Sequence, residues 1–251
     1  MSTARLASIW RHPIKAHGRE EVTEVALVPG ACLPGDRAWA LAHDATRFDP
    51  DHPAWTPCAS FQRGARTPSL MAIEARWDEA SGLLTLSHPD LPPLTFDPET
   101  EGDRFVAWVR PISPEGMFAP RALVRAPGRG MTDSPFPSVS VKSLSSLRDL
   151  SARMGRELSP HRFRGNLWVE GWEPWAEEGL VGRRLRVGDA VLEVRERVGR
   201  CKATHADPAT GRHDADVLPA LLGTRGETVF GLYAAVTEGG TVRAGDPVAV
   251  L

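Results

Sequence analysis

Apolar and polar residues alternate over many short stretches of the chain, which is the pattern of half-buried strands. Glycine and proline, 23 and 22 residues, recur between these stretches as turn formers. The stretches that alternate or are rich in β-branched residues are 6–10, 22–28, 37–42, 70–77, 83–87, 122–125, 139–141, 167–170, 184–187, 191–198, 229–236 and 247–251. The pattern therefore predicts a chain built mostly of short strands.

Helical spacing of apolar residues is rare in the sequence. The stretches that show it are 100–110, 144–154 and 216–222. Candidate caps at their starts are Thr100, Ser143 and Asp216, and Gly223 is placed to end the third helix. Many strands with few helices predict a fold that is mainly β with some α, in which barrels or sandwiches carry a few helices.

The chain of 251 residues is long enough for two modest domains. The stretch 111–120 contains prolines and a glycine and is the best candidate for a seam. We therefore expect a β-rich N-terminal domain over 1–119 and a second domain, a β-barrel, over 120–251. The stretch 47–66 has no clear pattern and is expected to be a long loop over the surface or over a site.

Charge, hydropathy and cysteine content argue against a nucleic-acid-binding, membrane-spanning or disulfide-rich secreted protein. The net charge is −2, so no overall field attracts the chain to nucleic acid or to a membrane surface. No apolar run is long enough to span a bilayer, and the N-terminus lacks the apolar core of a signal peptide. Three widely spaced cysteines argue against a disulfide framework. These features predict a cytoplasmic protein.

The clearest candidate for chemistry is Cys201, which follows a predicted strand and lies between Arg200 and Lys202. Flanking cations favour the thiolate, and a thiolate binds soft metals or attacks electrophiles. The plain alternative is a small buried apolar residue, the usual state of a free cysteine. A zinc site with His205 and His213 is a third interpretation, although no paired Cys or His motif supports it.

Other short motifs are weak when taken singly. Arg162 and Arg164 would point the same way on an extended backbone, which makes either an anion site or a solvated charged edge. Gly165 would let a ligand approach the backbone closely. Lys15 follows a predicted strand and is one of only three lysines. The stretches 35–37 and 132–136 resemble ordinary turns.

The order of the motifs is more informative than any one of them. From the N-terminus they read HPIK, GDRAWAL, TDSPF before SLSSL, FRGN before an apolar strand, GRCKATHADPATG and GDPVAVL. This succession resembles the MOSC family, the domains related to the C-terminal part of molybdenum cofactor sulfurase. The whole arrangement is similar to the amidoxime-reducing components and their bacterial relatives, which join an N-terminal β-rich domain to a MOSC β-barrel.

The resemblance implies a molybdopterin-type molybdenum cofactor whose metal is bound by Cys201, the catalytic position. The positions that match cofactor-holding groups are Lys15, Arg37, Asp133, Ser134, Arg164 and Asn166, with Arg200 beside the cysteine. Lys and Arg suit a phosphate, and a thiolate suits a soft metal. Because one cofactor touches all of them, Lys15, Arg37, Asp133, Arg164 and Cys201 are expected to converge on one cleft between the two halves.

The sequence also departs from the family pattern. His12 replaces a usual tyrosine, and Ala16 stands where relatives often carry a hydroxyl. Gly165 replaces a common proline, and Lys202 replaces an aliphatic residue just after the cysteine. These changes put in question one cofactor contact and the charge of the substrate pocket.

The implied activity is that of a molybdoenzyme, an oxidoreductase that reduces N-hydroxylated or related N–O compounds. The chain has neither four cysteines for an iron–sulfur cluster nor a glycine-rich dinucleotide motif. Electrons are therefore expected from an external ferredoxin- or flavin-type protein, and pyridoxal phosphate is not expected. One alternative is a non-catalytic carrier that holds the cofactor, or sulfur, on Cys201. Another is an anion site of unrelated purpose.

Overall fold

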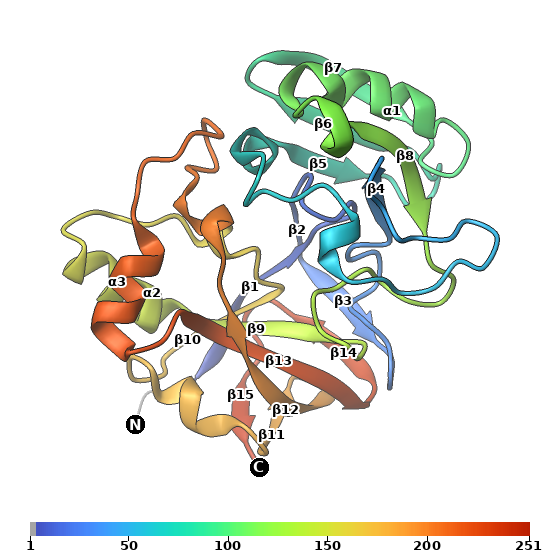
Figure 1. The fold of residues 1–251 in the computed structure, drawn as a ribbon. Helices are drawn as coiled ribbons and strands as arrows, with labels where there is room; N and C mark the ends of the chain where they lie inside the picture. Colours follow the sequence, from blue (N-terminus) through green and yellow to red (C-terminus); the bar gives the residue numbers. More distant parts are fainter. Residues whose placement is uncertain (1–3) are drawn as a thin grey trace.

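The computed structural model describes residues 4–251 and is drawn in Figure 1. Its largest element is an eight-stranded sheet in the order β15-β11-β12-β13-β9-β10-β1-β2. The strands are β1 (Arg5–Arg11), β2 (Glu20–Val22), β9 (Val139–Ser143), β10 (Leu167–Glu170), β11 (Arg184–Val187), β12 (Ala190–Gly199), β13 (Val229–Glu238) and β15 (Val248–Val250). Neighbours are antiparallel except β9 and β10, which run parallel. The fold is mainly β with some α, as predicted.

The eight-stranded sheet encloses the larger apolar core. Alternate residues of its strands, such as Val139 and Val141 on β9 or Leu192 and Val194 on β12, are fully buried together. Side chains along a strand point alternately to the two faces of a sheet, so this alternation in the sequence becomes a buried face. β1 contributes Leu6 and Ile9 to the same core, so the N-terminal strand packs with strands that lie more than 130 residues further along the chain.

A second body of structure lies above this sheet in Figure 1. It contains a three-stranded sheet, a two-stranded sheet and helix α1, which share a separate apolar cluster. The elements are β4 (Trp39–His43), β5 (Glu74–Trp77), β6 (Leu84–His88), β7 (Leu91–Phe96), α1 (Gly102–Val109) and β8 (Pro120–Arg125). β8 pairs with β4, and β3 (Glu24–Leu27) pairs with β14 (Gly240–Arg243). The domain boundary expected between residues 119 and 120 stays a prediction.

The three predicted helices are present with shifted ends. In α2 (Leu144–Arg153) the Ser143 side chain accepts a hydrogen bond from the Ser146 amide, as a cap should. α1 begins after Glu101, and Thr100 instead donates to Asp97. α3 (Val217–Arg225) has no side-chain cap at Asp216 and runs through Gly223 to a left-handed Gly226. The caps predicted at Thr100 and Asp216, and the end at Gly223, were wrong.

Several strand boundaries also differ from the pattern. The stretch 70–77 is extended only over β5, because Pro68 starts a 3-10 helix that continues to Ala72. The sequence pattern missed β7, whose Pro92 and Pro93 are tolerated because it is an edge strand. The stretch 47–66 is irregular apart from a short 3-10 helix at Cys58–Ser60, as expected, and it reaches the candidate site.

Candidate functional site

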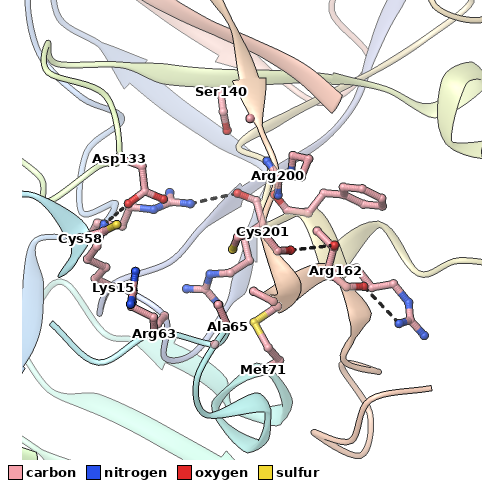
Figure 2. A pocket seen from close by; sticks show the side chains of 18 of the residues that line it. Lys15, Cys58, Arg63, Ala65, Met71, Asp133, Ser140, Arg162, Arg200 and Cys201 are labelled. Carbon is pink, nitrogen blue, oxygen red and sulfur yellow. Dashed lines mark hydrogen bonds and ion pairs between the residues drawn. The ribbon is translucent and has the colours of Figure 1, made fainter. Parts of the chain in front are cut away.

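A cavity of about 260 Å³ brings together residues from most of the length of the chain (Figure 2). Its walls come from loops at the ends of β1, β10 and β12 and from the irregular loops before β4 and β9. The residues expected to converge all line it: Lys15, Arg37, Asp133, Arg164 and Cys201, together with Arg200. The predicted convergence is confirmed, while the roles of these residues remain predictions.

The backbone around the cavity is strained at three places. Ala16, Arg37 and Arg164 line the cavity, and each has a left-handed conformation, with φ of 65°, 52° and 44°. Such a conformation costs a non-glycine residue roughly 1–3 kcal/mol, and it persists only where the surrounding structure imposes it. Trp175 is the remaining non-glycine example within residues 4–251. The concentration of this strain at one cavity makes the cavity the candidate functional site.

Lys15 and Asp133 form an ion pair across the cavity wall. The Lys15 Nζ donates to Asp133 Oδ1 at 2.5 Å and to the Met131 carbonyl at 2.7 Å. The lysine is buried, whereas the aspartate side chain is 54 % exposed. Partial desolvation by the surrounding protein tends to raise the pKa of Asp133, but the charge and hydrogen bond of Lys15 outweigh it and lower the pKa. Lys15 is thus held in place with its charge compensated.

Arg37 is held by a buried carboxylate. It donates to Asp36, which also accepts from the His12 amide at 2.9 Å. Burial tends to lower the pKa of Arg37, but the charge of Asp36 outweighs burial and raises it. For His12, burial and the charges of Arg164 and Arg37 lower the pKa. The second Arg37 nitrogen donates to the Arg164 carbonyl at 3.0 Å, so the loops before β4 and β10 are linked directly.

Arg164 and Arg200 have no such carboxylate partner within residues 4–251. The Arg164 guanidinium makes a long 3.5 Å contact with the Ile14 carbonyl, and Arg200 donates to the Phe163 carbonyl at 2.6 Å. Burial, with the nearby charge of Arg37, lowers the pKa of Arg164 to about 9. The Arg200 Nε is buried without a hydrogen-bond partner. Two cations in this state favour the binding of an anion.

Comparison with known proteins accounts for this arrangement. Residues 3–110 match the MOSC N-terminal beta barrel domain, and residues 131–249 match the MOSC domain. The chain belongs to the MOSC family. Among relatives, Mitochondrial amidoxime-reducing component 1 of Mus musculus is 34 % identical over 130 residues, which span 47 % of this chain and 37 % of that protein.

Other relatives match a similar share of the chain. The Molybdenum cofactor sulfurase of Caenorhabditis elegans is 32 % identical over 110 residues, which cover 43 % of this chain and 15 % of that protein. The chain therefore matches well under half the length of either relative. Among solved structures, the YuaD protein from Bacillus subtilis aligns over 99 % of this chain and 95 % of its own, with a TM-score of 0.48 and 14 % identity.

Two of the residues matched to the MOSC pattern do not line the cavity. Ser134 is buried, and its hydroxyl donates to the Phe136 carbonyl and to Ser138. The Asn166 amide oxygen accepts from the backbone and hydroxyl of Ser140, and its nitrogen donates to the Trp10 carbonyl. Ser140 itself lines the cavity, so Asn166 holds a residue of the cavity wall without lining the cavity itself.

The two arginines expected to point the same way are in different states. Residues 160–163 form a 3-10 helix and Arg164 is left-handed, so the extended backbone assumed for this stretch was wrong. The Arg162 guanidinium makes two hydrogen bonds to Asp214, at 2.7 and 2.8 Å. Gly165 approaches the side chains of Lys142 and Trp168 rather than the cavity.

Cys201 of this MOSC chain is exposed at the cavity, between the end of β12 and a 3-10 helix at Lys202–His205. The alternative of a small buried residue was therefore wrong. Within residues 4–251 no three His, Cys, Asp or Glu side chains are grouped to hold a metal ion, so the zinc interpretation finds no ligand set. A single thiol remains, which could serve a metal only if a cofactor supplied the other ligands. In the same range no helix is long and apolar enough to cross a membrane.

Sequence reasoning missed Lys142, a fully buried lysine on β9 that also lines the cavity. Its Nζ donates to the Phe230 carbonyl at 3.2 Å, and burial, with Arg200 and Arg37, lowers its pKa far below the ordinary value. The signal in the sequence is a lysine in the run VSVKS, where it follows alternating valine and serine.

Proposed function

We propose that this MOSC protein binds a molybdopterin-type molybdenum cofactor in the cavity and reduces N–O bonds of small N-hydroxylated compounds. The observation that carries the proposal is the pair of arginines, Arg164 and Arg200, that have no carboxylate partner in the described part of the chain and lie beside an exposed thiol. Such cations favour a phosphate, and a thiolate favours a soft metal. The residues of the cavity therefore fit the two ends of this cofactor.

In this proposal Lys15, Arg37, Arg164 and Arg200 hold the anionic part of the cofactor, and Cys201 binds its metal. The bound cofactor supplies the two-electron chemistry. The protein residues fix its position, because Asp133 and Asp36 hold Lys15 and Arg37 in single orientations before the ligand arrives. Reduction of an N-hydroxyl group to an amine consumes two electrons and two protons and releases water.

The electrons come, in this proposal, from a separate ferredoxin- or flavin-type protein. The sequence offers no dinucleotide motif of the type that follows a strand and opens a helix. We place the reaction in the cytoplasm, because a functional free thiol such as Cys201 requires a reducing compartment.

A second function deserves a test because Cys201 is exposed. A thiol at the surface is accessible to another protein, as a carrier of the cofactor or of sulfur would require. One of the relatives is itself named a molybdenum cofactor sulfurase.

Metal analysis combined with a turnover assay separates the two functions. The protein is produced in a host that makes the cofactor, and molybdenum is measured per chain. A reduced dye then supplies electrons for reduction of an N-hydroxylamine. Near-stoichiometric molybdenum with turnover supports the reductase, and molybdenum without turnover supports the carrier. Protein without molybdenum or turnover would contradict both.

A further inference from the structure

One wall of the cavity comes from a loop of the N-terminal body that has no role in the proposal above. The residues of this loop region that line the cavity are Cys58, Gln62, Arg63, Gly64, Ala65 and Met71. Arg63 is its only charged member. Figure 2 shows Arg63 and Cys201 on different walls of the same space.

The backbone of this loop is fixed beside the segment that follows Cys201. The Thr67 amide donates to the Arg63 carbonyl at 3.0 Å. A Cβ atom on Gly64 would lie 2.7 Å from the Met71 sulfur and 3.3 Å from Ala203 Cβ, so the loop packs tightly against the 3-10 helix after Cys201. Arg63 is therefore presented from a rigid position and not from a mobile loop end.

The Arg63 side chain is half-buried, and its guanidinium makes no hydrogen bond or ion pair to any residue in the part of the chain that the structure describes. The acidic residue that lines the cavity, Asp133, is already paired with Lys15. A planar guanidinium with free donors is suited to an oxyanion that it can bind with two hydrogen bonds.

Two groups could supply that oxyanion, the cofactor phosphate or the substrate. Arg37 donates to the Arg164 carbonyl, and Arg164 contacts the carbonyl of Ile14, the residue before Lys15, so the three cations form a compact anion site by themselves. Arg63 reaches the cavity from a separate element that packs beside Cys201. This separation favours the substrate.

We propose that Arg63 selects substrates that carry a carboxylate, so that the natural substrate class is anionic N-hydroxylated compounds. The inference rests on the proposed reductase function. Arg63 binds the carboxylate while the N–O group lies toward Cys201. Neutral N-hydroxylated compounds can enter the same cavity but lack this contact.

The test uses the molybdenum-loaded protein and two substrates that differ by one carboxylate, N-phenylhydroxylamine and 4-(hydroxyamino)benzoate. Arg63→Gln is expected to lower kcat/KM for the carboxylated compound by about tenfold or more, mainly through KM, and to leave the neutral compound unchanged. Arg66→Gln is the matched control, because Arg66 is exposed and stacks on the Phe118 ring at 3.5 Å outside the cavity. It should behave as wild type with both substrates.

A binding measurement tests Arg63 without turnover. Calorimetry with 4-aminobenzoate, the product of that reduction, should show a Kd about tenfold or more weaker in Arg63→Gln than in wild type or Arg66→Gln. This result would support the role of Arg63 even if the protein reduced nothing. The inference is overturned if Arg63→Gln weakens both substrates equally, if it leaves the carboxylate preference intact, or if it loses molybdenum, which would assign Arg63 to the cofactor.

Discussion

Individual residues of the cavity differ in how their charge is compensated. Lys15 and Arg37 each have a carboxylate partner, whereas Arg63, Arg164 and Arg200 have none among the described residues. Paired cations keep a fixed geometry at little cost, and unpaired cations gain most when an anion binds. The division between the two groups is the physical basis for expecting an anionic ligand.

At the residue scale, Cys201→Ser tests the metal ligand. Serine preserves the volume but removes the soft sulfur donor, so molybdenum content and dye-driven turnover should fall by at least about tenfold while the fold is kept. Molybdenum analysis and circular dichroism check both statements. Cys32→Ser and Cys58→Ser are the controls, and both proteins should retain metal and activity. Cys32 lies outside the cavity and Cys58 lines it. The two controls together separate a specific ligand role from a general effect of losing a thiol. A Cys201→Ser protein with full molybdenum would exclude the role.

A second residue, His17, predicts how stability depends on pH. It is fully buried, its Nε2 lacks a partner among the described residues, and burial lowers its pKa to about 4. Between pH 6.5 and 4 the unfolded chain binds a proton that the folded protein does not, so the free energy of unfolding falls as the pH falls through this range. The expected loss from His17 is about 3 kcal/mol.

Urea unfolding at pH 7 and pH 4.5 measures this dependence. His17→Gln should reduce the difference between the two pH values. His52→Gln is the control, because the His52 side chain is 87 % exposed, and it should leave the difference unchanged. An unchanged pH dependence in His17→Gln would show that other groups cause it.

At the scale of elements, β9, β10 and β13 are shaped around the buried Lys142. Gly231 on β13 has φ of 83°, and a Cβ atom there would lie 2.7 Å from the Lys142 Nζ and 2.8 Å from the Val141 carbonyl oxygen. Gly165, just before β10, also lies against this lysine, and a Cβ atom there would be 2.5 Å from the Lys142 Cγ. The lysine thus occupies a slot that exists because two neighbouring positions lack side chains.

Gly231→Ala should therefore destabilise the protein by about 2–4 kcal/mol, from steric overlap and from the positive φ. Gly223→Ala is the matched control, since Gly223 lies within α3 with open space around it. There alanine should stabilise by about 0.5–1 kcal/mol, because it favours the helix. Denaturant unfolding measures both changes. Equal stability of the Gly231→Ala and wild-type proteins would mean that the slot relaxes freely.

At the scale of the whole molecule, the cavity lies where the N-terminal body meets the eight-stranded sheet, and both contribute walls. Neither part forms the site alone. The chain also holds no motif for a nicotinamide dinucleotide, and the proposed reductase function therefore calls for an external electron donor.

We accordingly expect the isolated protein to be inactive with NADH or NADPH and active with a reduced dye. The net charge of −2 is too small to attract a donor protein by itself, so we expect docking to depend on local arginines. Salt screens such local charges, and the docking should therefore weaken as the salt concentration is raised. Turnover is followed by amine formation under anaerobic conditions. Sustained NADH-dependent reduction by the purified chain would contradict this expectation.

The sequence by itself determined the class of the fold and several of the residues that meet at the cavity. Alternation has a period of two, so it identified most strands whatever they pair with. The order of motifs such as HPIK and FRGN placed Lys15, Arg37, Asp133, Arg164 and Cys201 together, and they do meet at one cavity.

Only the tertiary structure decided how those residues are used. It buries Lys142, brings Arg63 to the cavity that holds Cys201 and engages Asn166 with Ser140, and it joins β1 to β10. Each of these depends on contacts between residues far apart in the chain, where burial and competing partners set the state of a polar group. Local sequence carries no record of such partners, and for that reason the paired or unpaired state of each charged residue in the cavity is known only once the fold has brought them together.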